Sequence, residues 1–189
     1  PLSGEIMLDG RSNASMTIAS ARAAGIAYLP SDRGRAGFAE SSVAENVVIA
    51  DFQPVTRGPM VDGDAVRRDA WSVIRDMGVV PADPERGLRA LSGGNQQKVL
   101  FGKWLRVSPR LMVLNEPTYG VDVISRRELF AGIRRARDEG MAVIWITTDL
   151  EEAVAISDRV GVFFQGRLRT ISKTSEVSAL DLNRAATGL

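Results

Sequence analysis

The sequence predicts an α/β protein with a parallel sheet, and two observations lead to this fold class. Continuous apolar runs occur at 26–29, 111–114 and 141–146. Segments with helical periodicity separate these runs. Apolar strands that alternate with helices are typical of a parallel sheet covered by helices on both faces. The 189 residues, 44% of them hydrophobic, are enough to bury a real core.

Turn residues set the boundaries in the first third of the chain. Asp9 and Gly10 end the first strand, Gly25 follows the first helix, and Pro30 stops the next strand. In order, we expect a strand at 5–8, a helix at 14–24, a strand at 26–29, a loop at 31–37, a helix at 43–51 and a connector at 56–63.

From Asp64 onward the helices and strands are easier to recognise. Val66, Ala70, Val73 and Met77 recur at the spacing of one helix face. The same reasoning gives a loop at 81–87, helices at 95–107, 125–138 and 150–157, and strands at 111–114, 141–146, 159–164 and 167–171.

The composition excludes several kinds of chemistry. Cysteine is absent, so disulfides and thiolate sites are excluded, and histidine, the usual general base, is absent as well. With 24 basic and 23 acidic residues, the chain has no excess charge that would favour binding to nucleic acid. No apolar run approaches the ~20 residues needed to cross a bilayer. The chain begins with Pro1 and carries no signal-peptide pattern, so we expect an excerpt of a longer protein.

The first motif is LSGGNQQK at residues 91–98. Gly93 and Gly94 leave backbone N–H groups uncovered at the start of a helix, where partial positive charge collects, and Ser92 adds a hydroxyl. This arrangement suits a phosphate group. A simple helix cap by Ser92 is the alternative interpretation.

The second motif, LMVLNEPT at residues 111–118, is an apolar strand that ends in polar residues. Asn115 and Glu116 would therefore lie at the carboxyl end of a central strand, where open α/β sheets bind ligands. Glu116 could accept a proton from a water that attacks a phosphate, although an exposed acidic loop residue is the alternative. Gly120 and Asp122 follow in a turn that could equally cap the next helix.

Together these motifs resemble those of an ATP-binding cassette (ABC). LSGGNQQK resembles the ABC signature, LMVLNEPT the Walker B strand with its following glutamate, and YGVD the D-loop. GIAYLPSDRGRAG resembles the Q-loop region, and ITTDLEEAVAISDRVGVFFQGRL the switch region and last strands. The ending NQQK is similar to the second, C-terminal cassette of tandem importers for ribose, galactose or xylose.

The resemblance implies a role for each motif in a pair of cassettes that clamp ATP between them. Ser92, Gly93 and Gly94 would contact the γ-phosphate of a nucleotide held by the partner, with Gln96 in the same motif. Asp122 would couple the two ATP sites across the interface.

Around the strand end, the resemblance implies that Glu116 is the general base and that Mg²⁺ sits near Asn115. Asn115 occupies the position of the Walker B aspartate, and Thr148 that of the switch histidine. Ser31 stands where a glutamine or glutamate is expected. These departures imply a weaker ATP site on this cassette than on its neighbour.

No Gly-x-x-x-x-Gly-Lys-Ser/Thr loop occurs in the sequence. The opening PLSGEIMLDG resembles the segment that follows this loop in the family. We therefore expect a truncated P-loop NTPase, with a parallel-sheet core and a helical subdomain. On its own it should be inactive and bind neither ATP nor Mg²⁺ tightly.

The implied function is that of the ATPase that powers sugar uptake, placed in the cytoplasm at the inner face of the membrane. The implied partners are a second cassette, transmembrane permease subunits and, indirectly, a periplasmic sugar-binding protein. We expect an ATPase core lobe at 1–30 and 105–189, a helical subdomain at 31–104, and permease contact at 31–46. A nucleoside importer and a non-transport ABC protein remain alternatives.

Overall fold

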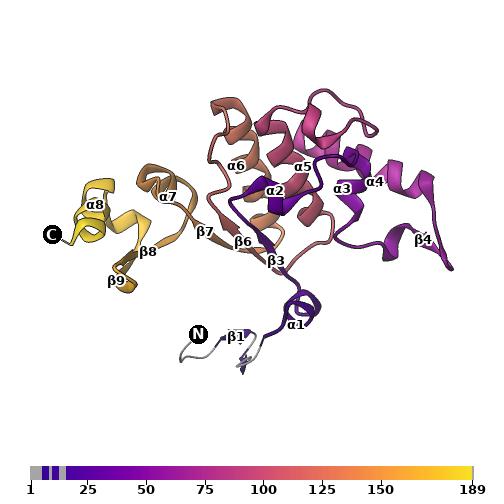
Figure 1. The fold of residues 1–189 in the computed structure, drawn as a ribbon. Helices are drawn as coiled ribbons and strands as arrows, with labels where there is room; N and C mark the ends of the chain where they lie inside the picture. The colour runs from indigo at the N-terminus through magenta and orange to yellow at the C-terminus, as the bar shows by residue number, and fades with distance from the viewer. Residues whose placement is uncertain (1–5, 9, 13–15, 189) are drawn as a thin grey trace.

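A three-stranded parallel sheet lies at the centre of the computed structural model, which describes residues 6–8, 10–12 and 16–188. Its strands are β3 (Ile26–Leu29), β6 (Leu111–Asn115) and β7 (Ala142–Ile146), in the order β3-β6-β7. β6 is the middle strand, with parallel partners on both sides. The expectation of parallel strands alternating with helices is confirmed (Figure 1).

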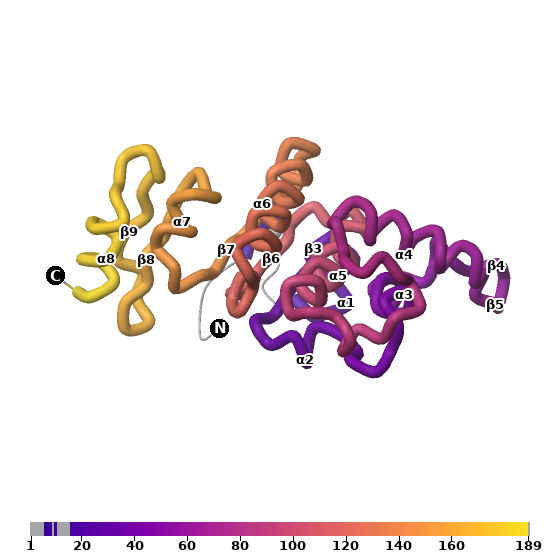
Figure 2. Tube along the Cα trace, turned by 90° about the horizontal axis from the view of Figure 1, so that it is seen from above, coloured from indigo at the N-terminus to yellow at the C-terminus, as the bar shows by residue number. Residues whose placement is uncertain are grey.

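Most helices gather on one side of this sheet, whereas the helices near the carboxyl end of the chain lie beside the last hairpin (Figures 1 and 2). The helices are α1 (Ile18–Ala23), α2 (Arg33–Ala36), α3 (Val43–Val48), α4 (Gly63–Met77), α5 (Gly93–Leu105), α6 (Val123–Asp138), α7 (Leu150–Ile156) and α8 (Ala179–Thr187). The remaining strands pair as antiparallel hairpins: β1 (Met7–Leu8) with β2 (Arg11–Ser12), β4 (Thr56–Arg57) with β5 (Met60–Val61), and β8 (Arg159–Phe164) with β9 (Arg167–Lys173).

Helix α5 forms the centre of the hydrophobic core. Val99, Leu100 and Phe101 are almost completely buried, and α5 contacts α3, α4 and α6. Lys103, on the same helix, donates from Nζ to the carbonyl oxygen of Ala36 at 2.5 Å. Burial lowers the pKa of the Lys103 ammonium to about 8, because the charged form loses its hydration. Even a cation on α5 is thus part of the core.

The sheet has one buried face and one open face, which corrects the expectation of cover on both sides. Leu29 and Leu114 are fully buried beneath the helices. On the other face Tyr28 and Ile144 are each 49% exposed, on either side of the half-buried Val113. The prediction failed because residues on the open face are also apolar, so the strands show no alternation between polar and apolar positions.

Two further details differ from the expectations. The predicted loop at 31–37 contains the short helix α2, which Asp32 caps by accepting a hydrogen bond from the N–H of Gly34. The predicted connector at 56–63 contains the β4–β5 hairpin, which lies at one end of the molecule (Figure 2). The strands predicted at 159–164 and 167–171 are confirmed as β8 and β9, which form their own antiparallel sheet. The predictions for residues 5, 9, 14 and 15 lie outside the described residues.

None of the described helices combines the length and the apolar character that a membrane span would require.

Candidate functional site

The first part of the site is the glycine turn, which we define as residues 92–94 at the start of α5. Ser92 caps the helix: its hydroxyl accepts hydrogen bonds from the backbone N–H of Asn95 at 3.4 Å and from the Asn95 side-chain amide at 2.9 Å. The simple cap interpretation is therefore correct as far as these contacts go. Ser92 is also exposed rather than packed in the core. The turn thus presents a hydroxyl and a helix amino terminus to the surface.

The glycine turn packs directly on the start of the next helix, α6. A Cβ atom at Gly94 would lie 2.7 Å from Asp122 Oδ2 and 2.8 Å from Ser125 Cβ. Real Cβ atoms essentially never approach other heavy atoms this closely, so only glycine fits here. The structure therefore brings Gly94 and Asp122 together, although they lie 28 positions apart in the sequence.

Asp122 caps α6 and remains exposed. Its carboxylate accepts a hydrogen bond from the backbone N–H of Ser125 at 2.9 Å. This bond, aided by the Ser125 hydroxyl, holds the pKa of the Asp122 carboxyl below its ordinary value. Asp122 is therefore ionised at neutral pH, next to the amino ends of two helices.

The second part of the site is the end of β6, where Glu116 is held by residues that follow β7. Its backbone N–H donates to the carbonyl oxygen of Ile146 at 2.8 Å. Its carboxylate accepts from the backbone N–H of Thr148 at 2.7 Å and from the Thr147 hydroxyl at 3.4 Å. Its φ of 46° turns the chain sharply away from the strand. The Glu116 side chain is therefore fixed at the ligand edge of the sheet.

Behind Glu116 lies a buried carboxylate that sequence reasoning missed. Glu152 Oε2 accepts hydrogen bonds from Thr118 at 2.9 Å, Thr147 at 3.1 Å and Trp145 at 3.3 Å. Its other oxygen faces Arg126 Nε at 3.9 Å. No local pattern marks this role, because a glutamate in the first turn of a helix is ordinarily an exposed residue whose charge interacts favourably with the helix dipole.

The remaining predicted residues are placed less directly. Asn115 is half-buried on the open face of the sheet, opposite Ile146. Gln96 donates from its side-chain amide to the Leu91 carbonyl oxygen at 3.0 Å, so it folds back on its own turn. Two groups therefore emerge, one around the glycine turn and Asp122, the other around Glu116 and Thr148.

The described residues fit a phosphate better than they fit a bare metal ion. The glycine turn offers a hydroxyl at a helix amino terminus, which suits an anion. No three acidic, histidine or cysteine side chains of the described part of the chain are grouped closely enough to hold a metal. Asn115 supplies a neutral amide oxygen, so Mg²⁺ would need oxygen ligands from a nucleotide and from water as well.

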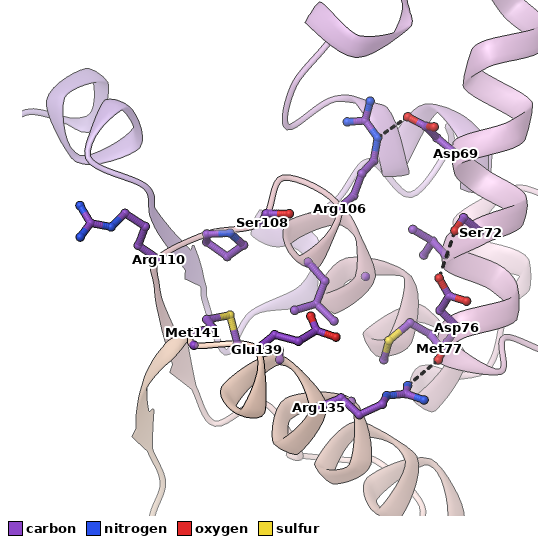
Figure 3. A pocket seen from close by; sticks show the side chains of 17 residues that line it. Asp69, Ser72, Asp76, Met77, Arg106, Ser108, Arg110, Arg135, Glu139 and Met141 are labelled. Carbon is purple, nitrogen blue, oxygen red and sulfur yellow. Dashed lines mark hydrogen bonds and ion pairs between the residues drawn. The ribbon is translucent and has the colours of Figure 1, made fainter.

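A cavity lies elsewhere, at the amino edge of the sheet (Figure 3). Its volume is about 690 Å³, and α4, α5, α6 and the loops before β6 and β7 line it. Two of its arginines are engaged with protein groups: Arg106 pairs with Asp69, and Arg135 donates to the Asp76 carbonyl oxygen. Because no predicted site residue lines this cavity, we do not assign the chemistry to it.

Comparisons with known proteins agree with these motifs. A family model described as ABC transporter matches residues 1–119. The chain is 36% identical over 189 residues to a ribose import ATP-binding protein of Geobacillus kaustophilus, covering 98% of this chain and 38% of that protein. It is 35% identical over 186 residues to a ribose import ATP-binding protein of Rhizobium johnstonii, covering 97% and 36%. The chain thus spans less than two fifths of the length of these relatives.

Among solved structures, the chain resembles an ATP-binding cassette determined as a dimer in a post-hydrolysis state with ADP and Pi. The TM-score is 0.77 at 20% identity, over 92% of this chain and 75% of that one. This likeness establishes the cassette fold, and with it the predicted class of α/β P-loop NTPase.

We expect Gly94→Ala to destabilise the chain because the new Cβ would force α5 away from α6. Overpacking of this kind typically costs about 1–3 kcal/mol. Urea unfolding followed by circular dichroism measures the effect. Gly63→Ala is the matched control, since a Cβ there has no atom within 4 Å. Equal unfolding midpoints for the two variants would contradict the close contact.

Proposed function

The chain belongs to the ABC transporter family, and we propose that it is part of the ATP-hydrolysing subunit that powers sugar uptake by an importer. The observation that carries the proposal is the pairing of an exposed glycine turn at a helix start with a carboxylate fixed at a strand end. The names of the relatives, which import ribose, favour a sugar over the nucleoside alternative.

The glycine turn, in this proposal, completes the ATP site of a second cassette. Ser92, Gly93 and Gly94 supply a hydroxyl and a helix amino terminus to the γ-phosphate, with Gln96 supporting the turn through Leu91. Asp122, packed on Gly94, transmits changes at this site to the neighbouring one. Because the solved cassette with the same fold is described as a dimer, pairing of two cassettes is a reasonable arrangement.

Glu116 acts as the general base in this proposal. Its carboxylate is oriented by the Thr148 N–H and the Thr147 hydroxyl, so the side chain need not be ordered during the reaction. It would accept the proton of the water that attacks the γ-phosphate. Thr148 donates through its backbone N–H, a contact that needs no histidine side chain. Mg²⁺ would neutralise developing phosphate charge, and the Asn115 amide oxygen would accept a hydrogen bond from a water bound to the metal.

Partner surfaces follow from the same assignment. We place the permease contact at 31–46, and a periplasmic sugar-binding protein would act through that permease. The subunit would then work in the cytoplasm against the inner face of the membrane. We also propose a core lobe at 1–30 and 105–189 and a helical subdomain at 31–104, supported by the mutual packing of α3, α4 and α5.

The Glu116→Gln variant tests the base. In the full-length protein assembled with its partners, we expect ATP turnover to fall by about 10²–10⁴-fold, because glutamine keeps the shape but cannot take a proton. Glu151→Gln, at an exposed position of α7, is the control and should keep normal turnover. Near-normal turnover in Glu116→Gln would remove Glu116 from the mechanism.

The Asn115→Asp variant tests the metal position. A carboxylate should bind a Mg²⁺-bound water more strongly than an amide does, so we expect about tenfold less Mg²⁺ at half-maximal turnover. The exposed Asn183→Asp, in α8, controls for the added charge. An unchanged Mg²⁺ requirement in Asn115→Asp would place the metal elsewhere.

The chain on its own should bind ATP poorly, because it contains no P-loop sequence to surround the phosphates. Isothermal titration calorimetry with Mg-ATP should give a Kd weaker than about 1 mM, and no hydrolysis should be detectable. Micromolar binding to the chain would show that the described residues already form a complete site.

A further inference from the structure

Arg33, which lies outside both groups of site residues, contacts the glycine turn and the turn that leads to Asp122. Arg33, in α2, donates from Nη2 to the Tyr119 carbonyl oxygen at 2.5 Å, across 86 residues of sequence. Its side chain is half-buried, although it lies in a polar stretch of the sequence.

The Arg33 guanidinium occupies the space beside two glycines. A Cβ at Gly93 would lie 2.7 Å from Nη1, and a Cβ at Gly120 would lie 3.2 Å from Nη2. At both glycines, therefore, the turns present only backbone atoms to Arg33. A planar guanidinium with five N–H donors can contact two segments at once, which the single ammonium of lysine cannot do in the same way.

The backbone that carries Arg33 is itself anchored to α5. Lys103 donates to the Ala36 carbonyl oxygen at the last residue of α2. A Cβ at Gly37 would lie 2.6 Å from a Leu100 methyl group, so the end of α2 is pressed onto the same helix. Arg33 thus extends from an anchored backbone. Its guanidinium contacts the glycine turn on one side and Tyr119 and Gly120 on the other.

We propose that Arg33 is a positioning residue that locks the glycine turn (residues 92–94) to the Gly120 turn, defined as residues 119–122. The lock joins these turns to α2, which lies within the 31–46 segment assigned to permease contact. Displacement of α2 withdraws the guanidinium and releases both turns together. The inference rests on the proposed function for its catalytic consequence, but the lock itself is a property of this chain.

Amide hydrogen exchange on the chain tests the lock directly. Loss of a hydrogen bond from a charged donor should speed exchange of the Gln96, Tyr119 and Val121 amides by about tenfold in Arg33→Ala. The control is Arg35→Ala, which removes an exposed arginine two residues along the same short helix. Equal exchange in the two variants would overturn the lock.

A double-mutant cycle sharpens this result. In Gly93→Ala the new Cβ takes the place of Nη1, so this variant should speed hydrogen exchange at the same amides as Arg33→Ala. Amide exchange in the double variant should be no faster than in the more affected single variant, because both changes break the same contact. If the two increases in exchange rate multiply, Arg33 and Gly93 act independently and the inference is wrong. Arg33→Lys should restore exchange only in part.

Turnover of the full-length protein with its partners then separates the lock from the proposed function. We expect Arg33→Ala to lower kcat about tenfold with little change in KM for ATP, because the turns remain present but misplaced. Ser92→Arg is the benchmark, and it should abolish turnover if the glycine turn meets a nucleotide. If Ser92→Arg abolishes turnover while Arg33→Ala keeps the turnover of the unsubstituted protein, only the positioning role fails. If Ser92→Arg keeps normal turnover, the proposed function fails, and the exchange cycle alone decides the lock.

Discussion

The whole arrangement depends on two helices that begin at the same place. Gly94, in the first turn of α5, touches Asp122 and Ser125 at the start of α6. Two helix amino termini each carry partial positive charge, so bringing them together would be unfavourable without an anion between them. The Asp122 carboxylate supplies that charge: it caps α6 and lies against the first turn of α5. The hydrogen bonds that Ser125 donates to it hold the pKa of the Asp122 carboxyl below its ordinary value.

This contact also ties the glycine turn to the strand end. Only five residues separate Glu116 from Asp122, and they form a compact turn. The Tyr119 N–H donates to the Glu116 carbonyl oxygen at 3.1 Å, and the Val121 N–H donates to the Thr118 carbonyl oxygen at 3.0 Å. A shift of α6 relative to α5 would therefore change the position of Glu116. The same segment carries the Thr118 hydroxyl to the buried Glu152, so the candidate base rests on a polar network rather than on a free loop.

Local sequence signals predicted the parts of the site that local structure creates. Ser92 and Asp122 were recognisable because capping residues act within three positions of themselves, and β6 because a continuous apolar run precedes Glu116. Long-range contacts were not recognisable. Arg33 lies in a polar stretch whose partner is 86 residues away, and nothing in the first turn of α7 distinguishes the buried Glu152 from an exposed glutamate. The open sheet face was missed because periodicity reports the polarity of a residue and not what covers it.

The open face of the sheet and the unpaired edge of β7 are the places beside the site where a further segment of protein can pack. In the described part of the chain β7 pairs only with β6, so its other edge presents backbone groups without a strand partner. Parallel sheets are normally covered on both faces, yet Tyr28, Val113 and Ile144 form an apolar surface here without such cover. A strand added in parallel at this edge would end beside the residues that follow β7, which are the ones that hold Glu116. The loop after such a strand would therefore meet the candidate base directly.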